Sequence, residues 1–178
     1  MRGGGNSSDD DSLSWRRTDP FKDQFELVAG NRVLSTLTIG GSTILTAHID
    51  VVRRALRLRA DEVGSQRMQI EDAFDGGMIG YFDQRWSGRA GILHLVEAGV
   101  LEWRQEGWWW RPTFVFTDRF ANPLVRLSPD GTVLELVLGD RLGSLTDSWQ
   151  GALLLLSLGW FLLVVSGRAR PPRLTLAV

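Results

Sequence analysis

The fold is decided by one uncharged stretch, Gly151-Ala152-Leu153-Leu154-Leu155-Leu156-Ser157-Leu158-Gly159-Trp160-Phe161-Leu162-Leu163-Val164-Val165. Asp147 and Gln150 have the spacing of a capping box at its start. Gly167 follows its end, where a helix C-cap favours glycine. The pattern predicts one helix over 148–166 that is apolar on every side. Such a helix must be buried in a protein core or in a bilayer.

Both placements of this helix are physically open. The uncharged stretch from Ser148 to Gly167 would be about 30 Å long, which is close to the thickness of the hydrocarbon layer. A membrane span would leave the basic residues after the helix in the cytoplasm and would export the rest of the chain. The N-terminus, however, lacks the pattern of a secretory signal. We therefore favour a buried helix in a cytoplasmic protein, and a single-pass membrane protein is the alternative.

The chain before this helix has the rhythm of an all-β protein. From Gln24 to Leu138, short runs rich in β-branched, leucine and aromatic residues alternate with Gly, Asn, Asp and Pro. In 55–60, leucines alternate with arginines, which gives a strand one apolar and one polar face. We expect about twelve strands, at 25–28, 33–39, 43–49, 55–60, 66–72, 78–83, 91–96, 100–104, 108–110, 113–118, 124–128 and 132–138.

Composition divides the chain into three parts. Residues 1–20 start with Gly, Asn, Ser and Asp and predict a disordered lead-in. Residues 21–167 form a single domain, and 168–178 form a basic tail. The absence of cysteine excludes disulfides and thiolate ligands. The formal net charge of −1 provides no overall attraction to nucleic acid, so we expect no nucleic-acid partner.

The order of many short antiparallel strands and one apolar C-terminal helix resembles the tubby, LURP-one and phospholipid-scramblase group. The segments that look similar are Phe25–Leu34, Phe114–Asp118, Asn122–Val125 and Leu158–Leu163. The resemblance implies a closed antiparallel barrel with the helix buried in its interior. The helix residues expected to contact the strands are Leu154, Leu155, Leu158, Phe161 and Leu162.

The same resemblance implies lipid contact rather than a defined chemistry. Tubby domains bind phosphoinositides through basic surface residues, and scramblases are linked to calcium and lipid movement. The sequence departs from the scramblase pattern in 138–147, where two carboxylates are too few for a calcium site.

Two features are candidates for contact with an anion. Arg53, Arg54, Arg57 and Arg59 form the densest basic stretch, and guanidinium groups bind phosphate as a bidentate fork. The simpler interpretation is a solvated outer face of a strand. In a strand over 108–110, the first and third indoles would share one face and Trp109 would point oppositely, so at least one faces outward. We favour packing for these rings, and a membrane interface is the alternative.

Catalytic motifs are missing from the sequence. His48 and His94 lie in separate predicted strands, and no Gly-x-Ser-x-Gly or P-loop motif occurs. Asp72 and Asp75 form an acidic group that we interpret as solvated carboxylates of a turn, and a metal or general-base role is the alternative. We expect no catalytic residue, cofactor or metal, and no particular protein partner is predicted. The leading hypothesis is a non-enzymatic barrel module that contacts anionic lipid or another phosphate-bearing ligand; its rivals are a single-span membrane protein and a hydrolase with an unrecognised site.

Overall fold

The computed structural model describes residues 12–19, 21–40, 46–51, 54–60, 67–85, 89–96, 99–137 and 149–170. Within these residues the chain forms twelve strands followed by one helix. The strands are β1 (Leu13–Asp19), β2 (Asp23–Ala29), β3 (Arg32–Gly40), β4 (Thr46–Val51), β5 (Arg54–Ala60), β6 (Arg67–Asp72), β7 (Met78–Gln84), β8 (Ala90–Leu95), β9 (Gly99–Trp108), β10 (Arg111–Thr117), β11 (Pro123–Leu127) and β12 (Val133–Leu136). The helix is α1 (Trp149–Val165).

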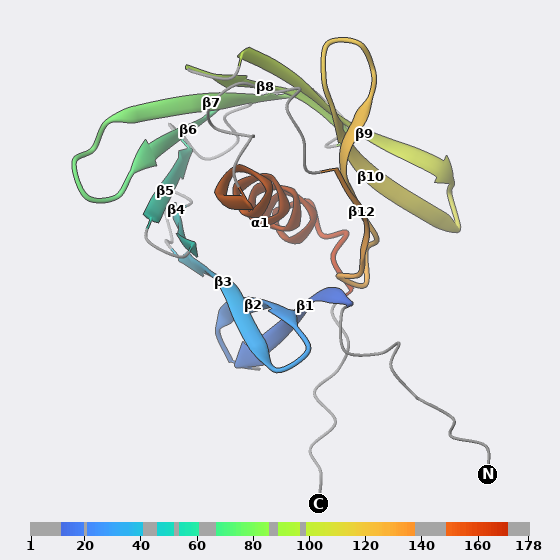
Figure 1. Cartoon of the computed structure of the whole chain (residues 1–178), viewed down its shortest axis with the longest axis horizontal. Helices are drawn as coiled ribbons and strands as arrows, with labels where there is room; N and C mark the ends of the chain where they lie inside the picture. The colour runs from blue at the N-terminus through green and yellow to red at the C-terminus, as the bar shows by residue number, and fades with distance from the viewer. Residues whose placement is uncertain are drawn as a thin grey trace, which may run out of the picture.

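The twelve strands form a single antiparallel sheet in which each strand pairs with the next along the chain. The two edges of the sheet meet at one bridge, between Ser14 and Thr132. Beside it, the Trp15 N–H donates to the Gly131 carbonyl oxygen at 2.9 Å. The sheet is therefore a nearly closed barrel, and Figure 1 shows it curving around α1. The predicted mainly β fold, with about twelve antiparallel strands and one C-terminal helix, is confirmed.

The helix packs against the sheet. All residues from 151 to 163 are buried, and α1 contacts β3, β4, β10 and β11. Trp160 stacks on Trp15 with ring centroids 6.0 Å apart and meets Phe25 edge-on at 5.8 Å. The one hydroxyl among the helix residues 151–163, on Ser157, lies 2.9 Å from the Ser35 hydroxyl. The helix residues named in the sequence analysis are all buried: Leu154, Leu155, Leu158, Phe161 and Leu162.

The end of α1 is a Schellman motif. Gly167 has a φ of 67°, and its N–H donates to the Val164 carbonyl at 3.0 Å. The Arg168 N–H donates to the Leu163 carbonyl at 2.8 Å. Gly167 therefore ends the helix as its position predicts. The capping box predicted at Asp147 and Gln150 lies outside the described residues and side chains.

Two predicted assignments along the chain are wrong. Residues 13–19, assigned to a disordered lead-in, form β1 and pair with β2, and Trp15 is fully buried against α1. The separate strand predicted at 108–110 does not exist, because Trp108 ends β9 and Trp109 and Trp110 form the turn before β10. Within the part of the chain that the structure describes, no helix has both the length and the apolar character needed to cross a membrane.

The burial of α1 predicts a large stability difference between two leucines. Leu158 is fully buried and Leu134 is 50% exposed. We expect Leu158→Ala to lower the free energy of unfolding by about 2–5 kcal/mol, because the change leaves a cavity between helix and sheet. Leu134→Ala is the matched control and should change it by no more than about 0.5 kcal/mol. Urea unfolding of both variants measures the difference, and equal losses would contradict a helix-centred core.

Candidate functional site

The β9–β10 hairpin extends beyond its neighbours in the sheet. β8 pairs with β9 only as far as Arg104, and β11 pairs with β10 only from Phe114 onward. The last rungs of the hairpin, from the pair Glu106–Thr113 to the pair Trp108–Arg111, are made by β9 and β10 alone. Figure 1 shows this two-stranded ribbon reaching out past the barrel wall. Among the described residues, no further strand pairs with these rungs, so the hairpin projects from the sheet.

A glycine sets the shape of this ribbon. Gly107 has a φ of 78°, which L residues with a side chain rarely adopt. A Cβ at this position would lie 2.7 Å from the Arg111 carbonyl oxygen. The two strands of the ribbon can approach each other here only because residue 107 has no side chain.

Three tryptophans form the tip of the hairpin. Trp108, Trp109 and Trp110 are 70%, 81% and 57% exposed. Trp108 and Trp110 stack with centroids 5.0 Å apart, and Trp109 meets Trp110 edge-on at 5.5 Å. The favoured interpretation of these rings as packed against the protein is wrong. All three rings point away from the core and pack on one another. We call these three residues the tryptophan tip.

A pocket of about 850 Å³ lies at the base of this tip. Four parts of the chain meet there: the residue before β8, the β9–β10 hairpin, the turn between β11 and β12 with the start of β12, and the segment after α1. Four arginines and one carboxylate line the pocket. Its lining residues are Arg89, Gln105, Trp109, Trp110, Arg111, Pro112, Thr113, Phe114, Ser128, Pro129, Asp130, Leu134, Gly167, Arg168 and Arg170. We call it the arginine pocket.

Arg168 is the most firmly positioned of these arginines. Its Nη1 donates to Gln105 Oε1 at 2.7 Å, and its guanidinium lies 5.7 Å from the centre of the Phe114 ring. Burial lowers the pKa of Arg168, and the positive charge of Arg89 lowers it further. Arginine stays protonated in proteins, so this lowering reports a cationic group held partly out of water and near a like charge.

Asp130, the one carboxylate among the described residues that line the pocket, is engaged in its own turn. Asp130 Oδ1 accepts the Thr132 N–H at 2.9 Å. Burial acts to raise the pKa of Asp130, but hydrogen bonds from Thr132 and Ser128 outweigh it and keep the pKa below its ordinary value. Asp130 is therefore ionised but turned to the backbone of its own turn, and the electrostatics of the pocket are dominated by arginine.

The arginines predicted from the sequence lie elsewhere. Arg57 and Arg59 sit on the outer face of β5, opposite the buried Leu56 and Leu58, as the alternation predicts. In register, Arg57 lies between His48 and Glu71 of the flanking strands. The side chain of Arg54 is not among those described, and Arg53 lies outside the described residues. Of the predicted contact residues, the structure brings only Trp109 to the arginine pocket, within the residues that it describes.

The four pocket arginines were missed because they are scattered along the sequence. Arg89 precedes β8, Arg111 begins β10, and Arg168 and Arg170 follow α1. Arg170 is fixed near the pocket because its N–H donates to the Pro129 carbonyl oxygen. Two features of the sequence pointed to these arginines: one arginine follows directly after three tryptophans, and a group of basic residues follows the helix.

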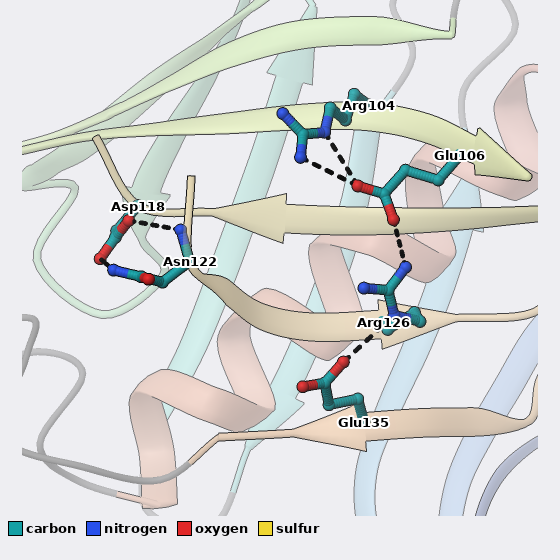
Figure 2. Close-up of polar contacts among 6 residues, drawn as sticks. All are labelled: Arg104, Glu106, Asp118, Asn122, Arg126 and Glu135. Atoms are coloured by element: carbon teal, nitrogen blue, oxygen red, sulfur yellow. Dashed lines mark hydrogen bonds and ion pairs between the residues drawn. The ribbon is translucent and has the colours of Figure 1, made fainter. Parts of the chain in front are cut away.

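A polar network on the outer face ties the base of the hairpin to the barrel (Figure 2). Glu106 Oε1 accepts from Arg104 Nε at 3.0 Å, and Glu106 Oε2 accepts from Arg126 of β11. Arg126 Nε then donates to Glu135 of β12 at 3.1 Å. In register, Val115 of β10 lies between Arg104 and Arg126, and it is fully buried. The network therefore links β9, β11 and β12 over an apolar residue of β10.

The Asp118 and Asn122 segment, one basis of the family resemblance, has a structural role. Asp118 Oδ1 accepts the backbone N–H groups of Phe120 and Asn122 at 2.8 and 2.9 Å. The Asn122 amide nitrogen donates to Asp118 Oδ2 at 2.9 Å, as Figure 2 shows. These bonds hold the turn between β10 and β11, in which Ala121 has a φ of 62°.

The remaining polar candidates do not converge on a chemical site. Asp72 and Asp75 accept backbone N–H groups within the β6–β7 turn, in agreement with their interpretation as turn residues. His94 stacks on Tyr81 at 4.4 Å, and its Nε2 lies 3.9 Å from Asp83. Across the residues that the structure describes, no three His, Cys, Asp or Glu side chains come together as a metal site.

Comparison of the chain with protein-family models, with curated proteins and with solved structures finds no match. The resemblance to the tubby, LURP-one and scramblase group therefore stays a prediction.

The network predicts a stability effect that depends on pH. The hydrogen bond from Arg126 lowers the pKa of Glu106, burial opposes this, and Arg104 adds to the lowering. A carboxylate with a lowered folded-state pKa stabilises the protein above its unfolded pKa, which is about 4.3, and loses that contribution as pH falls. Glu106→Gln should lower the free energy of unfolding by about 1 kcal/mol at neutral pH. The difference from wild type should shrink below about pH 4.

Urea unfolding at neutral and acidic pH measures this effect. Glu102→Gln is the control, because Glu102 is an exposed glutamate on the same strand. A loss in Glu106→Gln that stays constant with pH would contradict an electrostatic role for the network.

Proposed function

We propose that this chain is a non-enzymatic β-barrel module that binds a phosphate-bearing anion in the arginine pocket. The observation that carries the proposal is the gathering of four arginines, from three parts of the chain, around one pocket. Among the described residues, the carboxylate that lines the pocket, Asp130, accepts a backbone N–H of its own turn. Like charges repel, so such a cluster is favourable when an anion lies between them. Phosphate suits arginine because the guanidinium fork matches two of its oxygens.

Preorganisation of the pocket supports the same function. Gln105 and the Phe114 ring hold the Arg168 side chain, and the Schellman motif fixes its backbone. A group that is already in place loses little conformational entropy when it binds a ligand. Arg168 is thus the residue we expect to contribute most to affinity.

The shape of the pocket favours an organic phosphate over a bare ion. A volume of about 850 Å³ lies within the range of small-molecule sites, roughly 300–1,000 Å³. Trp109 and Trp110 line one side and supply apolar surface next to the arginines. A ligand with an anionic phosphate and a carbon skeleton, such as a lipid headgroup or a soluble phosphate ester, would use both surfaces.

The outer face of β5 is the competing location for anion contact. Its arginines follow one another along a single strand, and Arg57 has Glu71 beside it in register. The arginine pocket is lined instead by arginines from separate parts of the chain. A charge-matched pair of variants can therefore separate the two locations.

Titration with inorganic pyrophosphate tests the proposal. Replacing Arg111 and Arg168 together with glutamine should weaken pyrophosphate binding by about tenfold or more. Each hydrogen bond lost between a guanidinium and the anion is expected to raise the dissociation constant on that scale. The backbone N–H of residue 168 remains, so the helix end is retained. The control replaces Arg57 and Arg59 with glutamine and should bind as wild type does. Equal binding by the pocket variant, or a loss confined to the β5 variant, would refute the arginine pocket as the site.

A further inference from the structure

The tryptophan tip exposes more aromatic surface than the fold requires. Each of its indoles is more than half exposed, and none belongs to the core formed by the strands and α1. Soluble proteins rarely leave a contiguous apolar patch open to water unless it contacts a partner. Three adjacent exposed tryptophans therefore need an occupant that covers them.

The geometry of the tip favours a fluid surface over a preformed protein groove. The tip is the end of a projecting ribbon, and its rings stack on one another. The part of the ribbon beyond its neighbours spans three rungs, which is about 10 Å at the rise of a strand. That reach matches the depth of roughly 5–10 Å to which interfacial elements enter a bilayer.

The chemistry of the tip and its surroundings fits an anionic bilayer. Indoles are enriched at membrane interfaces, because the ring is apolar and its N–H remains polar. Arg111 follows the tip directly, and the other three arginines of the pocket lie behind it. Arginines at this level would face lipid phosphates once the rings had entered the interface. The charge is therefore complementary to anionic headgroups at the place where they would lie.

The hairpin is also held so that the tip keeps its direction. Glu106 lies in the rung nearest the barrel and is bound to Arg104 and Arg126. Gly107 permits the close approach of the two strands just beyond it. A rigid projection loses less entropy on insertion than a mobile loop would.

We infer that the tryptophan tip is a membrane anchor that inserts into the interface of an anionic bilayer. The inference rests on the proposed function, because the arginine pocket would then hold the phosphate of a lipid headgroup. It goes further by naming the bilayer as the source of that phosphate and the β9–β10 turn as the element that enters it.

Vesicle sedimentation tests the anchor. The full chain is mixed with phosphatidylcholine vesicles that contain phosphatidylserine, and with phosphatidylcholine vesicles alone. Wild type should sediment with the anionic vesicles, and added salt should weaken the binding. Replacing Trp108, Trp109 and Trp110 with serine should weaken it by about tenfold or more. Pyrophosphate binding by the single variant Trp108→Ser should stay within about threefold of wild type, because Trp108 is the ring of the tip that is not among the lining residues of the arginine pocket.

A matched control uses exposed aromatic residues at the opposite end of the barrel. Consecutive turns alternate between the two ends of an antiparallel sheet, so Phe74 and Phe120 lie in turns at the end away from the tip. They are 81% and 70% exposed. Replacing both with serine should leave sedimentation unchanged. The single variant Trp109→Ser changes only the most exposed ring of the turn, and it keeps the test decisive if the triple variant folds poorly.

The outcomes separate the anchor from the pocket. Unchanged sedimentation of the tryptophan variants would overturn the anchor, as would equal binding of wild type to neutral and anionic vesicles. Pyrophosphate binding by wild type without any sedimentation would also overturn it, and would leave the proposed function standing with a protein as the partner of the tip. Sedimentation that requires the tryptophans, with no pyrophosphate binding, would support the anchor and refute the arginine pocket.

Discussion

A helix without a polar face is the constraint on which the rest of the structure depends. α1 has apolar side chains in every direction, and hydrocarbon surface on all sides must be removed from water. A flat sheet could cover only one side of it. A sheet of twelve strands can instead curve around it almost into a barrel, as Figure 1 shows. The need to remove the apolar surface of α1 from water thus accounts for both the long antiparallel meander and its nearly closed shape.

The same helix also builds the candidate site. Its last turn ends in the Schellman motif at Gly167, which turns the chain and places Arg168 beside Gln105 of β9. Arg170 is then fixed by the β11–β12 turn. Because the buried residues of α1 hold the helix in register with the sheet, they also set where these arginines lie. The packing of α1 against the sheet therefore determines where the pocket arginines at the end of the helix lie.

Structural features that depend on local sequence periodicity could be predicted from the sequence. Features that depend on tertiary contacts between distant segments could not. The alternation of leucine and arginine in β5 assigned its two faces, and Gly167 marked the helix end. Strand β1 was missed because its two large apolar residues, Leu13 and Trp15, follow a polar segment whose composition suggests disorder. The tryptophan tip was misplaced because three β-favouring residues fit a strand, whereas the register places two of them in the turn. The pocket arginines come from distant segments, so no local pattern could have gathered them.

The position of α1 after all twelve strands has a consequence for biosynthesis. During translation the strands leave the ribosome before the residues that will fill the space between them, and each carries an apolar face that has no partner. The bridge that closes the ring also joins β1 to a segment more than a hundred residues later. The barrel must therefore assemble after synthesis of its helix, from a nascent chain with exposed strand edges. For this architecture, the interval between the first strand and the last helix is when association with other unfolded chains, or protection by a chaperone, competes with folding.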